Sequence, residues 1–174
     1  MASYILKENL NELEIPTIVE TANIKEYLDK NNLKYKYSYN ASKNFMKKAK
    51  AKNKSLNYFI DIHRDSVKKE ATTLSKNNKN YAKVMFIVGL EHENYKKNLK
   101  LAEELNYALS LKLSGISRGI IKKSGSNVNG IYNQDFHENT LLLEIGGIDN
   151  TIEEVYNTME ILGEVISNYV KGKE

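Results

Sequence analysis

The run from Asn57 to Ile62 constrains the fold of this chain more than any other segment. It is rich in aromatic and β-branched side chains and ends in His63, Arg64 and Asp65. A run of this kind is typical of an interior strand of an α/β sheet. Ligands of open α/β sheets bind beyond the carboxyl ends of the strands. The sequence therefore predicts an α/β domain with a functional site where this strand ends.

Helical segments alternate with further strands. Pro16 favours the first turn of a helix expected to run to Asp29, and Asn40 or Ser42 is expected to cap a second helix that ends before Asn53. Later helices are expected over residues 94–113 and after a cap at Asn150 or Thr151.

Residues 70–74 and 81–88 predict a hairpin whose second arm is a buried strand. Short apolar runs predict two more strands, over residues 119–121 and 140–145, with a polar loop over residues 124–130. Alternating strands and helices predict a three-layer α/β domain, with a central mixed or mostly parallel sheet flanked by helices.

Composition narrows the function classes. The 174 residues, 41% of them hydrophobic, suffice for one core, so residues 1–174 are expected to form a single domain. The absence of cysteine excludes thiol catalysis, disulfides and cysteine metal ligands. No apolar run predicts a transmembrane helix, and no signal peptide is recognised at the N-terminus. The formal charge of +4 comes mainly from lysine, and without an arginine-rich stripe we expect no nucleic-acid partner.

Glu144 is the second residue, after His63, that the sequence marks as a candidate for function, because it interrupts the apolar strand over residues 140–145. A carboxylate buried in hydrocarbon is costly unless it is paired. Either Glu144 is functional, or it forms an ion pair with Arg64 or Arg118. Together with His63 it offers the parts of a metal site or of a general acid/base pair. The alternative for His63 is a hydrogen-bonded core histidine, beside an ordinary surface ion pair of Arg64 and Asp65.

Several motifs follow one another in a specific order: Tyr39-Asn40-Ala41-Ser42, Asp61-Ile62-His63-Arg64-Asp65, Phe86-Ile87-Val88-Gly89 with Asn94-Tyr95 and Asn98-Leu99, Arg118-Gly119-Ile120, Tyr132-Asn133-Gln134-Asp135, and Leu143-Glu144-Ile145-Gly146-Gly147 with Asn150-Thr151 and Glu153-Glu154. Over residues 16 to 170, their order and spacing resemble the stage II sporulation protein P family. That family is similar to the zinc-dependent N-acetylmuramoyl-L-alanine amidases, which cut the bond between the lactyl group of muramic acid and the first alanine of the stem peptide in bacterial cell walls.

The resemblance implies an amidase-like fold, a Zn²⁺ cofactor, and the stem peptide and glycan of peptidoglycan as substrate. It also implies an extracytoplasmic location, in the cell wall or between forespore and mother cell. His63 resembles a histidine ligand of the zinc, and Glu144 resembles the glutamate that handles protons on the zinc-bound water and on the leaving amine. Zinc lowers the pKa of its bound water to about 7, which suits this role of a nearby carboxylate.

Other residues are predicted to contact substrate. Arg64 and Arg118 could bind a stem-peptide carboxylate in a forked geometry. The alternative is ion pairing with Asp65, Asp61 or Glu144. Asp65 belongs to the same motif as His63, and Asn133 and Gln134 lie on a polar loop expected to touch substrate amides. His92 and His137 are weaker candidates, which with His63 would complete a three-histidine zinc site, although loop histidines are more often simply exposed.

One departure from the family is serious. Its members carry a motif of the type Thr-His-x-x-Glu-x-Tyr at the end of a first strand, which supplies a histidine and a glutamate ligand. Here only Tyr4 matches, so the N-terminal strand with the first ligand motif is expected to be missing. A catalytic zinc takes three protein ligands and water.

Three explanations remain open: a chain shortened at its N-terminus, a relative that lost the metal, or replacement ligands such as Glu8, Glu12, Glu14 and Glu20. The first hypothesis for function is therefore a zinc amidase. The second is a non-catalytic relative that binds peptidoglycan or regulates a partner wall hydrolase. The sequence does not predict an oligomeric state.

Overall fold

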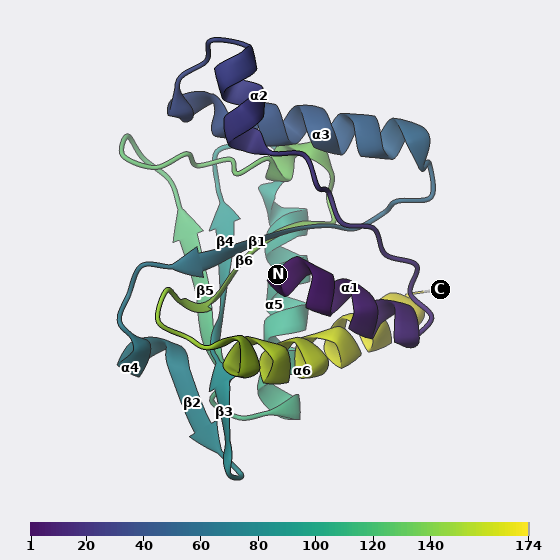
Figure 1. Cartoon of the computed structure of the whole chain (residues 1–174). Helices are drawn as coiled ribbons and strands as arrows, with labels where there is room; N and C mark the ends of the chain where they lie inside the picture. The colour runs from purple at the N-terminus through teal and green to yellow at the C-terminus, as the bar shows by residue number, and fades with distance from the viewer. Residues whose placement is uncertain (174) are drawn as a thin grey trace.

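The computed structural model describes residues 1–173, which are built around a four-stranded sheet of order β1-β6-β4-β5 (Figure 1). The strands are β1 (Phe59–Asp65), β4 (Val84–Gly89), β5 (Ser117–Lys123) and β6 (Thr140–Gly147). β1 runs parallel to β6 and β4 runs parallel to β5, whereas β4 and β6 are antiparallel. The predicted mixed α/β sheet is confirmed.

The helices lie on both faces of this sheet (Figure 1). They are α1 (Ala2–Glu12), α2 (Ile24–Lys30), α3 (Ser38–Lys52), α4 (Lys69–Thr72), α5 (Tyr95–Lys112) and α6 (Ile152–Lys171), with the 3₁₀ turns η1 (Tyr35–Tyr37) and η2 (Gln134–Phe136). A separate hairpin consists of β2 (Thr73–Lys76) and β3 (Lys79–Ala82).

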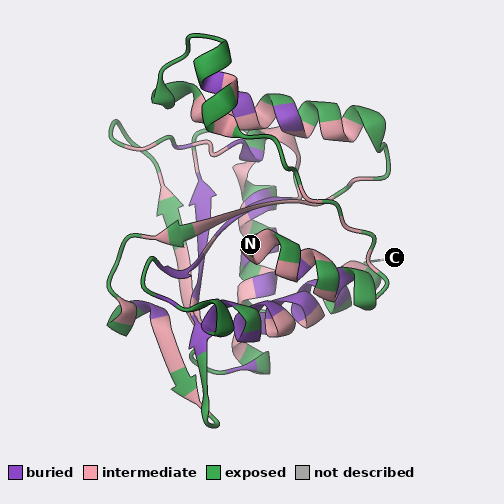
Figure 2. Cartoon of the chain, in the orientation of Figure 1, coloured by how far each residue is buried: buried purple, intermediate pink, exposed green. Residues whose placement is uncertain are grey.

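Side chains along β4 alternate between two apolar clusters on opposite faces of the sheet, as the two-residue period of a strand requires. Phe86 and Val88 belong to the larger cluster, which also holds the buried leucines of α1 and α5 and the buried face of α6. Met85 and Ile87 belong to a smaller cluster with Tyr39 and Tyr132. The buried faces are visible in Figure 2, where β4 and much of α6 are coloured as buried. The predicted three layers are thereby confirmed.

Three local predictions were wrong. β1 is an edge strand, not an interior one, and none of its residues is fully buried, because four of its seven side chains are polar or charged. The helix expected from Pro16 begins only at Ile24, where the Asn23 side chain accepts the Glu26 amide as a cap. The second arm of the predicted hairpin divides after Ala82, so that β3 pairs with β2 while β4 enters the central sheet.

The N-terminal segment is the helix α1 and contains no strand within residues 2–12. Leu6 and Leu10 of α1 are buried in the larger cluster against α6. Gly163 of α6 faces this contact, where a Cβ would lie 3.2 Å from the Asn9 Cβ. Tyr4 therefore lies on a helix, half-exposed, and does not end a strand.

The final helix begins as predicted, with Thr151 as its cap. Thr151 Oγ1 accepts the Glu154 amide and the Glu154 carboxylate accepts the Thr151 amide, which forms a capping box. Asn150 instead fixes the preceding turn, since its Oδ1 accepts the Gly147 amide. Within residues 1–173, no helix has the length and apolar character needed to cross a bilayer.

Candidate functional site

Pairing of β1 with β6 brings together His63 and Glu144, the two residues that the sequence most clearly marks as functional candidates. His63 of β1 and Glu144 of β6 are register partners in a parallel pair, so their side chains project from the same face of the sheet. Asp61 lies two residues before His63 and shares that face. Met85 of β4, which is opposite Glu144 on its other side, packs with Tyr39 of α3. The face that carries this site is therefore the one covered by α3.

Asp61 and His63 form a hydrogen-bonded pair. The Nε2 atom of His63 lies 3.1 Å from Asp61 Oδ1, and the side chains are 40% and 41% exposed, so a ligand can reach them. The hydrogen bond to Asp61 raises the pKa of His63, which burial opposes and the charges of Asp61 and Glu144 reinforce. Asp61 thus orients the imidazole and favours its protonated form, which leaves Nδ1 as the other ring nitrogen for a ligand.

Glu144 is half-buried, and its Oε2 atom is buried with no hydrogen-bond partner among residues 1–173. Burial raises the pKa of Glu144. The positive charges of His63 and Arg118 act in the opposite direction, whereas the negative charges of Asp65 and Asp61 raise this pKa further. The predicted alternative, an ion pair with Arg64 or Arg118, is not formed within the described residues, because both arginines bind elsewhere. An unpaired carboxyl group in an apolar strand is costly for the fold.

Arg118 of β5 pairs with Asp65 at the end of β1, with 2.7 Å between Nη1 and Oδ2. Burial opposes the ionisation of Asp65, but hydrogen bonds from Arg118 and from the Val67 amide hold its pKa below the ordinary value. The pair links the two edge strands of the sheet. A substrate carboxylate bound by Arg118 would have to share the guanidinium with Asp65.

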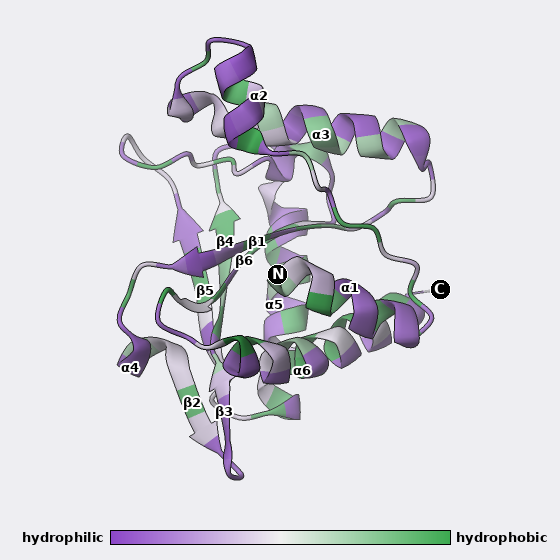
Figure 3. Cartoon of the chain, in the orientation of Figure 1, coloured by the Kyte–Doolittle hydropathy of each residue, from purple (hydrophilic) through white to green (hydrophobic). Residues whose placement is uncertain are grey.

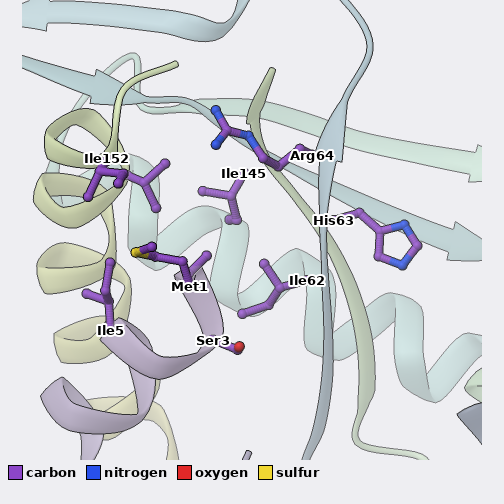
Figure 4. Close-up of a pocket in the computed structure, with 10 residues that line it drawn as sticks. Met1, Ser3, Ile5, Ile62, His63, Arg64, Ile145 and Ile152 are labelled. Carbon is purple, nitrogen blue, oxygen red and sulfur yellow. The ribbon is translucent and has the colours of Figure 1, made fainter. Parts of the chain in front are cut away.

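Arg64 does not share a face with His63. Its guanidinium donates to the carbonyl oxygens of Gly147 and Asn150, at 2.5 Å and 2.6 Å from Nη2. Figure 4 shows the two side chains pointing in different directions, with His63 directed away from the apolar residues that line this pocket. Hydrogen bonds to the β6–α6 turn therefore favour a structural role for Arg64.

The turn itself depends on glycine. Gly146 has φ of +62°, and a Cβ at this position would lie 2.5 Å from Asn150 Oδ1. No side chain fits there. The register of β1 and β6 shifts between His63 and Asp65, opposite this turn. The glycines after Glu144 thus allow β6 to bend directly beyond the site.

A groove of about 600 Å³ runs between α2, η1, the start of α3 and the polar face of β1. Its lining includes Ile24, Lys25, Leu28, Asp29, Leu33, Tyr35, Ser38, Tyr39, Ser42, Asp61 and His63. Burial, together with the nearby charge of Asp61, raises the pKa of Tyr39, so its hydroxyl stays neutral and can donate. The groove thus opens onto the Asp61–His63 pair.

Asn133 and Gln134 join the loop before β6 to α3 and to β4 by hydrogen bonds. Asn133 Nδ2 donates to the Tyr39 carbonyl and to Ser42 Oγ. Gln134 Nε2 donates to the Ile87 carbonyl, and its Oε1 accepts the Gly89 amide. Both side chains are buried. These contacts favour a positioning role over direct contact with substrate.

The remaining histidines are separate from His63. Burial lowers the pKa of His92, whose Nε2 has no hydrogen-bond partner among residues 1–173. Burial also lowers the pKa of His137, whose Nδ1 accepts the Asn139 amide. No group of three or more His, Asp or Glu side chains within residues 1–173 is placed to hold a metal ion. The described residues therefore do not supply the three protein ligands of a catalytic zinc.

Sequence reasoning missed two contributors. The sequence gives Asp61 only a place in a motif and a possible role as partner of an arginine, and it gives Tyr39 only a place in a motif. The Asp-x-His spacing did carry a signal, since residues two apart on a strand share a face. No sequence signal places Tyr39 against β4, because that contact joins segments from two distant parts of the chain.

Comparisons with known proteins agree on one family. The profile of the family "Stage II sporulation protein P" matches residues 2–167. The protein named stage II sporulation protein P from Bacillus subtilis (strain 168) is 41% identical over 153 residues, which cover 88% of this chain and 38% of that protein. This chain thus spans well under half the length of that relative. No solved structure gives a significant match.

Proposed function

The chain belongs to the stage II sporulation protein P family, and we propose that it is a peptidoglycan hydrolase domain of the N-acetylmuramoyl-L-alanine amidase type. One observation carries this proposal: Glu144, whose Oε2 atom has no hydrogen-bond partner among residues 1–173, shares a sheet face with His63 and Asp61, which line an open groove. A fold retains such a costly carboxyl group most readily where it serves function. Since the chain covers 38% of the relative, the activity of the whole protein is part of this proposal.

The reaction adds water to the lactyl carbonyl carbon and breaks its bond to the alanine nitrogen. The products are a lactyl carboxylate and the free amine of the stem peptide. Glu144 is the proposed proton carrier, because a carboxyl group with a raised pKa can accept the proton of water and return it to the departing nitrogen. Without zinc, the His63 imidazolium, supported by Asp61, would stabilise negative charge that develops on the carbonyl oxygen. With zinc, a neutral His63 would instead hold the ion, and the ion would supply that stabilisation.

Zinc is a separate part of the proposal. The family resemblance makes His63 a zinc ligand, yet the described residues contain no three-donor group. Zinc titration followed by calorimetry, with a His63→Ala variant beside the parent chain, tests this point. Stoichiometric zinc that depends on His63 would support the amidase, and binding that the variant retains would refute the ligand role.

The second candidate is a non-catalytic domain that binds peptidoglycan, or regulates a partner wall hydrolase, in an extracytoplasmic compartment. It is favoured because residues 1–173 contain no group of three or more His, Asp or Glu side chains placed to hold a metal ion. In this case Asp61, His63 and Tyr39 would bind the stem peptide by hydrogen bonds, and Glu144 would serve recognition.

Digestion of purified peptidoglycan separates the two candidates. The chain is incubated with peptidoglycan with and without added zinc, and released stem peptides with a free alanine amine are measured by mass spectrometry. Release that Glu144→Gln abolishes, and that the surface control Glu103→Gln retains, supports the amidase. Binding to peptidoglycan without release, in both conditions, supports the second candidate.

A further inference from the structure

Positive charge is concentrated in one segment of the chain. Residues 30–60 contain nine lysines and no aspartate or glutamate, so the rest of the chain carries a formal net charge of −5 against the total of +4. Lys43 pairs with Asp135, and Lys50 donates to backbone carbonyls. The other seven are exposed and have no ion pair within residues 1–173, and we call them the lysine surface: Lys30, Lys34, Lys36, Lys47, Lys48, Lys52 and Lys54.

The lysine surface follows one structural unit, formed by α2, η1 and α3. Ala41 and Phe45 are the buried residues of α3. Lys48 and Lys52 are exposed and continue the same side of the helix toward its C-terminal end, whereas the exposed Lys47 lies roughly opposite them. Figure 3 shows hydrophilic segments along α3 that alternate with hydrophobic ones. From Ser38, which lines the groove, to Lys52 the helix extends about 21 Å at 1.5 Å per residue. A track of positive charge thus leads from the groove along α3.

Exposed aromatic rings lie at the groove end of this track. Tyr35 is 83% exposed and lines the groove, and it stands between Lys34 and Lys36 in the sequence. Tyr37 is also exposed, at 39%. Solvent-exposed tyrosines offer flat apolar faces with a polar rim, on which a sugar ring can stack. Lysines between such rings provide cations for acidic groups on the same polymer.

The proposed reaction creates a polymer of this kind. Each amide cleavage leaves a carboxylate on a muramic acid residue and removes its peptide, so the cut glycan becomes a regular polyanion. We propose that the lysine surface, with Tyr35 and Tyr37, docks the glycan strand that carries these free lactyl carboxylates. This inference rests on the proposed function and extends it: the enzyme would retain its product strand while the next stem peptide enters the groove.

Arginine content separates this occupant from a nucleic acid. The chain has two arginines, Arg64 and Arg118, and neither lies on the lysine surface. Nucleic-acid surfaces more often use arginine for phosphate and base contacts.

The test measures binding in the absence of zinc, so it is independent of catalysis. Glycan strands stripped of stem peptides by an unrelated amidase are titrated into the full chain by calorimetry. The probes for comparison are the same strands with their carboxylates converted to methyl amides, and oligo(dT). The variant is Lys47→Gln/Lys48→Gln/Lys52→Gln, and the matched control is Lys68→Gln/Lys79→Gln/Lys96→Gln, which removes three exposed lysines elsewhere.

We expect the variant to bind stripped glycan about tenfold more weakly, since three exposed charge contacts of modest strength are lost. The control should stay within about twofold of the parent chain. Equal binding of the methyl-amide strands, tighter binding of oligo(dT), or no loss in the variant would overturn the inference.

A second readout separates this inference from the proposed function. The parent chain and the variant are compared on a single disaccharide-peptide unit, too short to reach along α3. If neither cleaves it but stripped glycan still binds through the lysines, the amidase proposal fails and the docking surface stands. If both cleave it equally and the lysines do not affect glycan binding, the docking surface fails and the amidase stands.

Discussion

Replacing Glu144 by methionine should stabilise the fold. Glu144 lies in a strand whose other residues are all buried, and its Oε2 atom is buried without a hydrogen-bond partner among residues 1–173. Its neighbour on β4 is Met85, in the cluster with Leu142. Methionine has a similar length, requires no hydrogen bond and can pack into that cluster.

The expected change in the free energy of unfolding equals the cost of burying the unpaired carboxyl oxygen, which the substitution removes. A buried polar atom without a partner costs about 1–3 kcal/mol, so Glu144→Met should raise the free energy of unfolding at pH 7 by about that amount. For a chain of this size, each kcal/mol corresponds to about 2–4 °C in Tm. The same variant should lose any amide hydrolysis, because it lacks the proton carrier.

The stability gain from Glu144→Met should depend on pH, and the raised pKa of Glu144 determines in which direction. Below the ordinary glutamate pKa of 4.5 the carboxyl group is protonated in both states, and its charge costs nothing. As pH rises through the folded pKa, the charged form destabilises the parent chain. The gain from Glu144→Met is therefore largest near neutral pH and shrinks on acidification.

Urea unfolding at pH 7 and near pH 4 measures this effect, with Glu103→Gln on the exposed face of α5 as the control. The control should change the free energy of unfolding by less than about 0.5 kcal/mol. If Glu144→Met were less stable than the parent chain at pH 7, Glu144 would be stabilising the fold through a charge interaction. Retention of Glu144 for function alone would then be refuted.

Three further predictions concern the surroundings of the site. Asp61→Asn should lower the pKa of His63 in an NMR titration, and an unchanged titration would contradict the pairing. The raised pKa of His63 stabilises the fold at acid pH, and this stability is lost as pH rises through that pKa, so the variant should lack it. Arg64→Met should cost about 2 kcal/mol in urea unfolding, because it removes charged hydrogen bonds to the β6–α6 turn, and an unaffected protein would show that the turn does not need them. Thr151→Ala should cost about 1 kcal/mol through loss of the capping box, whereas Thr151→Ser should restore most of it.

Local sequence signals account for much of the fold. The strands at 59–65 and 140–147 and the helices at 38–52, 95–112 and 152–171 lie close to where the sequence pattern predicts them, and Thr151 caps the last helix as expected. The expected caps Asn40 and Ser42 are wrong, because both residues lie inside the helix that begins at Ser38. The failures have a common cause. Whether Pro16 starts a helix, or whether residues 79–89 form one strand or two, is decided by which partner the backbone finds, and a sequence window does not contain that partner.

For the candidate site, too, the sequence determined some features and the tertiary structure decided others. Residue chemistry by itself determined that His63 and Glu144 are unusual, because a histidine among charges and a carboxylate in an apolar strand conflict with simple packing. Tertiary structure alone decided that the two are register partners, that Asp61 pairs with His63 and not with an arginine, and that Arg64 lies on the opposite face. The physical reason is that a strand fixes only which side chains alternate along it, whereas register, sheet order and the covering helices decide which of them meet.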